Sequence, residues 1–293
     1  MRKKAIYQLR LTVVCIFFGV IMSGCGPNRA TKCVTQITEN CRAGYAQVND
    51  ITMYYEIHGS GEPVLVLHGS GDSIESMKNA IIALSKNYQV IAADTRGHGR
   101  TTDSDQPFSN ELFAKDIIAL MDLLKINKAH VVGLSDGGRT GLALAIKYPD
   151  RVSKLVTIGT NFSLDGYTDR VIDLINNPEK REMPPIPPVY EQYAPDPSHW
   201  PVLVEKLWES THDEPIYTRD NLEKIQAPVL VMLGERDNIV RLEHAEELAK
   251  LIPNATLFVV PDTGHNIFEV NQYITPDSVN VGIEAILEFL VME

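Results

Sequence analysis

Short apolar runs alternate with amphipathic segments along most of the chain. The apolar runs are bounded by glycine, proline or polar residues, a pattern typical of buried parallel strands. They occupy residues 63–67, 89–93, 129–134, 152–158, 228–233 and 256–260. Between them, apolar residues recur at helical spacing over residues 77–86, 109–124, 139–148, 243–252 and 279–291. This alternation predicts an α/β fold with a doubly wound, mostly parallel sheet and right-handed crossovers.

A hairpin is expected ahead of the first parallel strand. Residues 45–48 and 52–58 are rich in β-forming side chains and flank Asn49 and Asp50, which suit a tight turn. Together with the parallel strands they define a predicted core of residues 44–160 and 225–293.

Residues 161–224 break the pattern. They hold nine of the 17 prolines and both tryptophans, Trp200 and Trp208. The proline-rich run 184–188 cannot form regular helix or a central strand. Helical spacing returns in three fragments, at residues 167–176, 201–210 and 218–225. We therefore predict an inserted helical cap, whose aromatic side chains either line a pocket over the sheet or only join the cap to the core.

The amino-terminal residues are typical of an export signal. Basic residues Arg2, Lys3 and Lys4 precede an apolar run, residues 11–22, that is short for a membrane span. The run ends in Met22-Ser23-Gly24-Cys25, which resembles the lipobox of bacterial lipoproteins. A plain signal peptide and an uncleaved anchor are the alternatives.

The lipobox resemblance has consequences for localisation. It implies that residues 1–24 are a signal peptide and that Cys25 becomes lipid-modified. Residues 25–43 would then tether the domain to a bacterial membrane, on its periplasmic or cell-surface side. The two later cysteines, Cys33 and Cys41, precede the first strand and either close a small loop or remain free thiols.

The charge balance argues against polyanionic partners. The formal net charge is −11, and removal of the basic leader would make it more negative. Nucleic acid is therefore not an expected partner. The sequence also lacks a metal-ligand cluster and a dinucleotide-binding loop, so neither a metal nor another cofactor is predicted.

The strongest chemical signal follows the apolar run 129–134. There Gly133, Ser135 and Gly137 form a GxSxG motif between a predicted strand and a predicted helix. The glycines let strand and helix cross closely, and the serine hydroxyl is held out of the sheet. The first amides of the helix suit an anion beside that hydroxyl, as acyl transfer requires. The alternative is an ordinary turn in which Ser135 caps the helix.

Three further candidate residues follow other predicted strands. Ser70 lies in the glycine-rich loop after residues 63–67, Asp237 follows 228–233, and His265 follows 256–260. Because the carboxyl ends of parallel strands share one edge, these residues are expected near Ser135. His98, between two glycines, is interpreted as a structural loop residue. Asp262 is a less favoured alternative to Asp237, because it lies so near His265 in sequence.

The order serine, aspartate, histidine completes a resemblance. Residues 45–293 resemble an α/β-hydrolase-fold serine hydrolase, through these motifs: His68-Gly69, Arg96-Gly97-His98-Gly99, Gly133-x-Ser135-x-Gly137, Gly234-x-x-Asp237 and Gly264-His265. The resemblance implies that Ser135 is the nucleophile, His265 the general base and Asp237 its acidic partner. The amides of Ser70 and Asp136 would form the oxyanion hole.

The expected reaction is hydrolysis of small carboxylic esters through an acyl-enzyme. Acyl transfer, perhydrolysis or carbon–carbon bond hydrolysis on the same fold remain alternatives, as does an inactive ligand-binding lipoprotein. Ser135-Asp136-Gly137-Gly138 is also similar to the valacyclovir-hydrolase (biphenyl-hydrolase-like) branch. There the acid after the nucleophile is linked to a preference for amino-acid esters. Asp136 would then accept a substrate ammonium, or only its backbone amide matters.

Overall fold

A computed structural model describes residues 33, 37–38, 41–211, 217–271 and 274–292. The predicted signal peptide and Cys25 lie outside the described residues, as does most of the predicted tether.

One eight-stranded sheet forms the centre of the molecule, in the order β1-β2-β4-β3-β5-β6-β7-β8. The strands are β1 (Arg42–Val48), β2 (Ile51–His58), β3 (Glu62–Leu67), β4 (Tyr88–Ala93), β5 (Ala129–Leu134), β6 (Val152–Ile158), β7 (Val229–Gly234) and β8 (Ala255–Val260). β1 and β2 form the predicted antiparallel hairpin, and β2 is antiparallel to β4. All other pairings are parallel, so the predicted α/β class is confirmed.

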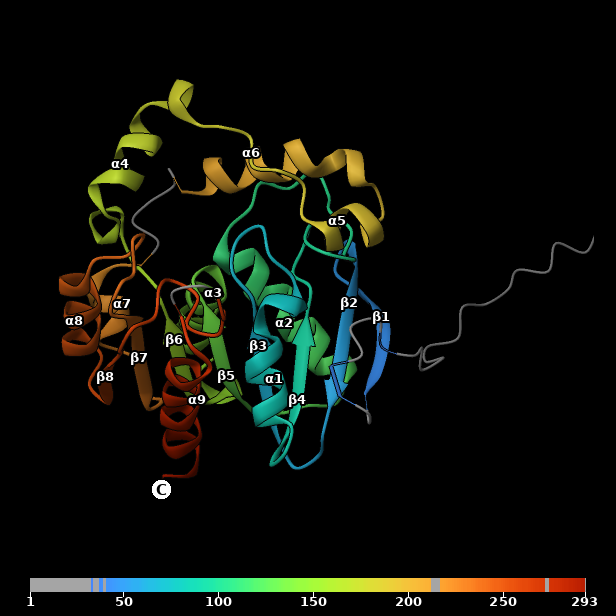
Figure 1. Ribbon diagram of the computed structural model, residues 1–293. Coiled ribbons are helices and arrows are strands. Elements are labelled where there is room, and N and C mark those ends of the chain that lie inside the picture. Colours follow the sequence, from blue (N-terminus) through green and yellow to red (C-terminus); the bar gives the residue numbers. More distant parts are fainter. Residues whose placement is uncertain (1–32, 34–36, 39–40, 212–216, 272–273, 293) are drawn as a thin grey trace, which may run out of the picture.

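Helices cover both faces of the sheet (Figure 1). The α-helices are α1 (Lys78–Leu84), α2 (Asn110–Leu123), α3 (Asp136–Lys147), α4 (Asp169–Asn176), α5 (Pro188–Tyr193), α6 (Trp200–Ser210), α7 (Arg219–Leu222), α8 (Leu242–Leu251) and α9 (Pro276–Val291). Five 3₁₀ turns among the described residues join them: η1 (Ile74–Met77), η2 (Pro149–Arg151), η3 (Leu164–Gly166), η4 (Pro178–Lys180) and η5 (Pro197–His199). Buried side chains of α2, α3 and α8 pack on one face of the sheet, and those of α1 and α9 on the other.

Two helices differ from the sequence prediction. α3 begins at Asp136, three residues before the predicted start at 139, because the low helix propensity of Gly137 and Gly138 hides its first turn. α5 was not predicted, since it follows a run of prolines. It begins on Pro188, and a proline is tolerated at the first position of a helix because no intrahelical bond needs its N–H.

The inserted segment between β6 and β7 lies over the carboxyl edge of the sheet (Figure 1). Of its helices, α4, α5 and α6 form the cover, whereas α7 contacts α3 and α8. A cluster of buried apolar residues joins the cover to the core: Phe108, Phe113, Tyr190, Trp200, Leu203 and Val204. The cap is thus fixed to α2 and to the loop before it by apolar packing.

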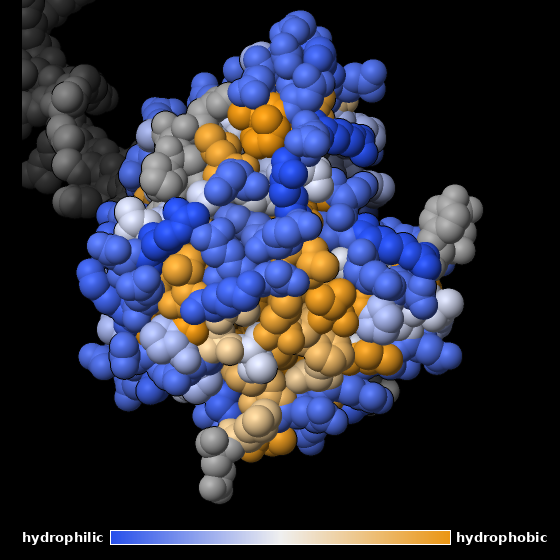
Figure 2. Space-filling model, turned by 90° about the vertical axis from the view of Figure 1, so that its left-hand side faces the viewer, coloured by the Kyte–Doolittle hydropathy of each residue, from blue (hydrophilic) through white to orange (hydrophobic). Residues whose placement is uncertain are grey.

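The surface is mixed in character. Figure 2 views the molecule from the side of the edge strand β8, where polar side chains dominate the upper part and apolar ones gather below. The carboxyl-terminal end of α9 is exposed, with Val291 71% and Met292 65% accessible. Among the described residues, no helix combines the length and the apolar character needed to cross a membrane.

Candidate active site

The turn between β5 and α3 has the geometry of a strained elbow. Ser135 has φ 52° and ψ −113°, a backbone conformation that a non-glycine residue rarely adopts. Its N–H donates to the carbonyl of Ile158 at 2.7 Å, which fixes the turn to the end of β6. A Cβ on Gly133 would lie 2.3 Å from the Gly137 oxygen, and one on Gly137 would lie 2.2 Å from the Leu67 oxygen. The two glycines are therefore required by close backbone contact, as the sequence predicts.

Asp237 and His265 meet at the same edge of the sheet. His265 Nδ1 lies 2.8 Å from Asp237 Oδ2. The other carboxylate oxygen, Oδ1, accepts the N–H groups of Ile239 at 2.8 Å and Val240 at 3.0 Å. The Asp237 side chain is 1% exposed and that of His265 is 19% exposed. A buried carboxylate with three donors is well placed to hold one imidazole tautomer, with Nδ1 protonated and Nε2 free to accept a proton.

Gly159 was not singled out from the sequence, yet it contacts both members of this pair. Its φ is 55°, and a Cβ there would lie 2.9 Å from the His265 ring and 3.1 Å from Asp237 Oδ2. The preceding residue, Ile158, accepts the Ser135 amide, so neighbouring residues at the end of β6 contact Ser135 and His265. The available signal was a glycine directly after a predicted strand, at the edge that carries the other candidates.

The loop after β3 is oriented by His68. Its Nδ1 lies 2.8 Å from the Gly69 oxygen, and its Nε2 accepts the Thr95 N–H at 3.0 Å. Burial lowers the pKa of His68 to about 4, so the ring is neutral and donates through Nδ1. Since C=O and N–H of a trans peptide point in opposite directions, the Ser70 N–H points away from His68. A Cβ on Gly69 would lie 3.4 Å from the Ser135 Cβ, so this loop borders the elbow.

The Asp136 carboxylate is buried and already occupied. Its Oδ2 accepts the Ser70 hydroxyl at 2.7 Å. Its Oδ1 accepts Asn110 Nδ2 at 3.0 Å and pairs with Arg139 Nη2 at 2.8 Å. Burial opposes ionisation, but the Arg139 charge and the two hydrogen bonds outweigh it and hold the pKa of Asp136 below its usual value. The carboxylate thus ties the elbow to the Ser70 loop.

The remaining candidates have other partners, although the His98 ring lies 5.1 Å from that of His68. His98 is 1% exposed, and its Nδ1 donates to the Arg96 oxygen at 2.9 Å, consistent with the structural role expected for it. The Asp262 side chain is 58% exposed and pairs with Arg236 rather than with His265. Cys33 and Cys41 form a disulfide, which settles the choice between a closed loop and free thiols.

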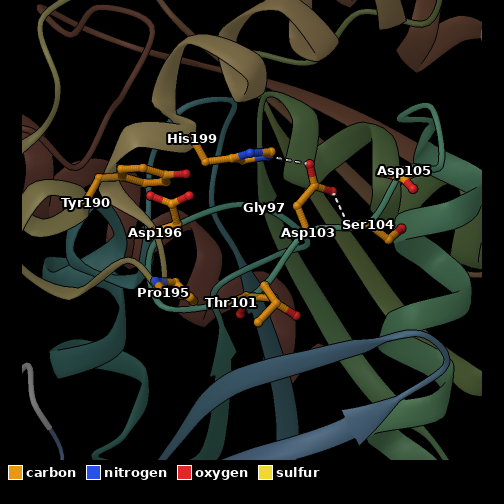
Figure 3. A pocket seen from close by; sticks show the side chains of 10 residues that line it. Gly97, Thr101, Asp103, Ser104, Asp105, Tyr190, Pro195, Asp196 and His199 are labelled. Atoms are coloured by element: carbon orange, nitrogen blue, oxygen red, sulfur yellow. Dashed lines mark hydrogen bonds and ion pairs between the residues drawn. The ribbon is translucent and has the colours of Figure 1, made fainter.

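Two cavities lie between the cap and the core. One, of about 270 Å³, is bordered by the loop after β4 and by the start of the cap helices (Figure 3), where Asp103 pairs with His199. The other, of about 290 Å³, runs from Gly71 in the Ser70 loop to Pro187, Pro188 and Tyr190 of the cap. Neither cavity is lined by Ser135, Asp237 or His265 themselves.

A mostly parallel sheet with an elbow serine and a histidine–aspartate pair at its carboxyl edge defines a class of hydrolytic enzymes. A family model described as alpha/beta hydrolase fold matches residues 62–182 and 192–272. The chain belongs to this α/β-hydrolase family and is an enzyme.

Individual relatives agree with the family. The chain is 31% identical over 268 residues to RutD of Caulobacter sp. (strain K31), provisionally named a carbamate hydrolase, covering 81% of this chain and 95% of that protein. It is 28% identical over 279 residues to the serine hydrolase BPHL of Homo sapiens, covering 90% and 92%. Among solved structures, the enol-lactonase from Burkholderia xenovorans LB400 has a TM-score of 0.68 at 23% identity, covering 85% of this chain and all of that one. The last similarity concerns the fold alone.

Proposed function

We propose that this hydrolase is a serine esterase that cleaves small carboxylic esters through Ser135, His265 and Asp237. The observation that carries the proposal is the 2.8 Å contact between His265 Nδ1 and Asp237 Oδ2 at the edge where Ser135 occupies a strained turn. A serine hydroxyl is a weak nucleophile at neutral pH, and an oriented imidazole is the usual means of activating it.

The reaction follows from these positions. His265 Nε2 takes the Ser135 proton as the hydroxyl oxygen attacks the ester carbonyl, and Asp237 offsets the charge of the imidazolium that forms. The tetrahedral oxyanion is stabilised by the Ser70 and Asp136 amides, the second being one of the unpaired donors at the start of α3. His265 then returns the proton to the leaving alcohol. Water repeats the sequence on the acyl-Ser135 ester and releases the acid.

A cavity beside the Ser70 loop offers space for the substrate. The 290 Å³ cavity that starts at Gly71 has prolines, a valine and Tyr190 on its cap side and polar side chains, Asp72, Ser73, Glu75 and Ser76, on its core side, and its volume suits a small acyl or alcohol group. The Asp136 carboxylate is buried and already paired with Arg139, so we do not expect it to bind a substrate ammonium group. We therefore favour neutral esters over amino-acid esters.

A covalent probe and one variant test the chemistry. A fluorophosphonate should label the folded enzyme at Ser135, and Ser135→Ala should abolish both labelling and hydrolysis of p-nitrophenyl esters. The proposal fails if the label maps to another residue or if Ser135→Ala retains full activity. Faster turnover of an acyl-transfer, perhydrolysis or carbon–carbon bond substrate than of any ester would keep the triad but replace the esterase assignment.

We further propose that the enzyme is exported and lipid-anchored at Cys25. The support is the Met22-Ser23-Gly24-Cys25 motif after a basic and apolar leader. Growth of an expressing bacterium with labelled palmitate should label the wild-type chain but not Cys25→Ser. Equal labelling of both chains would refute the assignment.

A further inference from the structure

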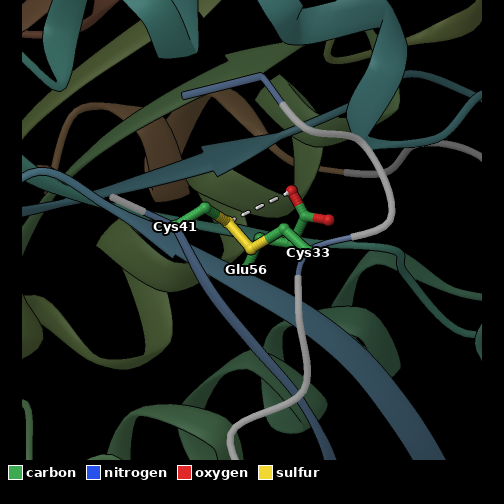
Figure 4. Close-up of side chains that lie close together, drawn as sticks. All are labelled: Cys33, Cys41 and Glu56. Atoms are coloured by element: carbon green, nitrogen blue, oxygen red, sulfur yellow. Dashed lines mark hydrogen bonds between the residues drawn. A yellow bond between two sulfur atoms is a disulfide. The ribbon is translucent and has the colours of Figure 1, made fainter. Parts of the chain in front are cut away.

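A buried polar cluster surrounds the disulfide, on the outer strands of the sheet. Cys41 directly precedes β1, and β1 pairs with β2 so that Arg42 faces Ile57. This register places Cys41 beside His58. Glu56 and His58 are two residues apart on β2 and so share one face of that strand. Cys33 completes the group through its bond to Cys41 (Figure 4).

Three of these side chains lie close enough to share one ion, and His58 lies beside two of the three. One sulfur each from Cys33 and Cys41 and one oxygen of Glu56 all lie within 4.8 Å of one another. His58 Nε2 is 3.6 Å from Cys41 Sγ and 3.0 Å from Glu56 Oε2. Around a tetrahedral Zn²⁺ with bonds of about 2.3 Å to sulfur, two thiolates lie about 3.8 Å apart. The Cα–Cα distance of 5.9 Å between the cysteines allows that separation without movement of the backbone.

The disulfide alone does not account for this environment. Glu56 and His58 are both 0% exposed. They pair with each other at 3.0 Å, which offsets part of the cost of removing them from water, and a disulfide needs neither of them. Two cysteines, a histidine and a carboxylate are, however, a ligand set that suits Zn²⁺.

We propose that Cys33 and Cys41, once reduced to thiols, form with Glu56 and His58 a four-ligand site for a thiophilic divalent cation such as Zn²⁺. The disulfide form has no thiolate to offer, so oxidation closes the site and reduction opens it. The inference concerns β1 and β2 and does not rest on the proposed function.

Reduction of the disulfide precedes metal binding. A phosphine and one water convert the disulfide to two thiols, and the phosphine becomes its oxide. Binding of Zn²⁺ then releases the two thiol protons, and Glu56 binds as its carboxylate through Oε2. The product carries one net negative charge, since two thiolates and a carboxylate face a dication.

The surrounding contacts suit the loaded form. His58 Nδ1 lies 2.9 Å from Thr38 Oγ1, so the ring can donate Nδ1–H to this hydroxyl while Nε2 binds the ion. Tyr54 donates its hydroxyl to Glu56 Oε1 at 2.5 Å, and Glu56 Oε2 lies 3.0 Å from His58 Nε2, so an ion bound by both would replace that contact.

Cobalt titration tests the proposal on the full chain. The starting protein carries Cys15→Ser and Cys25→Ser, so that Cys33 and Cys41 are its only cysteines. After reduction with a phosphine, it should bind one Co²⁺ per chain with thiolate-to-metal charge-transfer absorption, and Zn²⁺ should displace the cobalt. The oxidised protein should show no such absorption.

Variants separate this site from a simple dithiol chelate. His58→Asn and Glu56→Gln should each weaken Co²⁺ binding by about tenfold or more, since even second-shell changes cost that much. His130→Asn is the matched control: His130 is also buried and pairs with Glu62 at 3.2 Å, but no cysteine is part of that pair. Its binding should equal that of the starting protein.

Three results would overturn the proposal. They are the absence of Co²⁺ binding by the reduced protein, unchanged affinity in both His58→Asn and Glu56→Gln, and equal charge-transfer absorption by the oxidised protein. Should reduction unfold the chain, Zn²⁺ must restore its circular dichroism and thermal transition. Failure to do so would count equally against the site.

Discussion

At the scale of single residues, the ends of the strands place backbone where a side chain would not fit. Gly159 is the clearest case, because its missing Cβ leaves the space that the His265 ring and the Asp237 carboxylate occupy. Its positive φ of 55° favours glycine for a second reason. Both the limited space and the backbone conformation therefore require glycine at position 159, beside the proposed base His265.

Gly159→Ala should lower kcat beyond what any loss of folding stability explains. The new methyl group must displace His265 or Asp237, and a displacement of about 1 Å in such a site can cost about 10²-fold in rate. Gly61→Ala is the control, since Gly61 also has positive φ, 120°, but lies in the loop before β3. It should lose stability in urea titrations and keep kcat. Unchanged kcat in Gly159→Ala would separate Gly159 from catalysis.

The Asp136 side chain should act on the loop and not on the substrate. We expect Asp136→Asn to slow neutral and aminoacyl p-nitrophenyl esters by the same factor, because the change disturbs the Ser70 contact and the Arg139 pair but removes no substrate contact. Ser70→Ala breaks the same hydrogen bond and should show the same lack of discrimination. A selective loss of the aminoacyl ester in Asp136→Asn would instead indicate direct contact with an ammonium group.

At the scale of elements, one acidic residue adds to the apolar packing that holds the cap on the core. Asp103, in the loop between β4 and α2, accepts Lys206 Nζ of α6 at 2.7 Å and contacts His199 Nε2 at 2.9 Å. Its side chain is 6% exposed. Lys206 also lies 4.2 Å from the centre of the Phe108 ring. Charge and apolar packing therefore act together where α6 meets the loop before α2.

Loss of this contact should loosen the cap. Asp103→Ala leaves Lys206 without its carboxylate partner, so we expect faster limited proteolysis within the cap and a several-fold higher KM. The proposed triad is untouched, and kcat should change less. Asp173→Ala removes the exposed pair of Asp173 with Lys180 inside the cap, which contributes little, and serves as the control. Identical proteolysis of the two variants would contradict a fastening role for Asp103.

Helices and strands could be predicted where burial of one face makes apolar residues recur at a regular spacing. The parallel strands and α2, with Ser109 accepting the Leu112 N–H at its start, follow directly from the order of apolar residues. The positions of Asp237 and His265 followed from strand order alone, and the structure brings them into contact. Sequence could not reveal that Arg139 and Asn110 surround Asp136, since that depends on how α2 packs against α3. Gly159 and α5 were not predicted because glycine and proline usually mark the ends of helices and strands.

At the scale of the whole molecule, buried histidines link stability to pH. His68 and His98 are 2% and 1% exposed, with ring centres 5.1 Å apart. Burial and the neighbouring His68 lower the pKa of His98 to about 4, from its ordinary 6.5. Between these two pH values the unfolded chain binds more protons at this histidine than the folded chain does. The free energy of unfolding therefore shows no pH dependence from His98 above pH 6.5 and falls as the pH decreases from 6.5 toward 4.

His98→Gln should weaken this dependence. Glutamine can still donate to the Arg96 oxygen but does not titrate. We expect the fall in unfolding free energy between pH 7.5 and pH 5 to be smaller than in the wild type by about 2 kcal/mol. Urea denaturation at the two pH values measures the difference. Parallel falls in both proteins would show that His98 contributes nothing to acid sensitivity.

The cap also bears on how such an enzyme diversifies. It leaves the core after β6 and returns at β7, and these two strands are neighbours in the sheet. Both of its attachments are therefore close together, and its described residues contribute no strand to the sheet. Evolution can lengthen, shorten or replace this insertion and thereby change the substrate selectivity. The residues proposed to carry out the chemistry lie on the core, whose fold does not depend on the insertion.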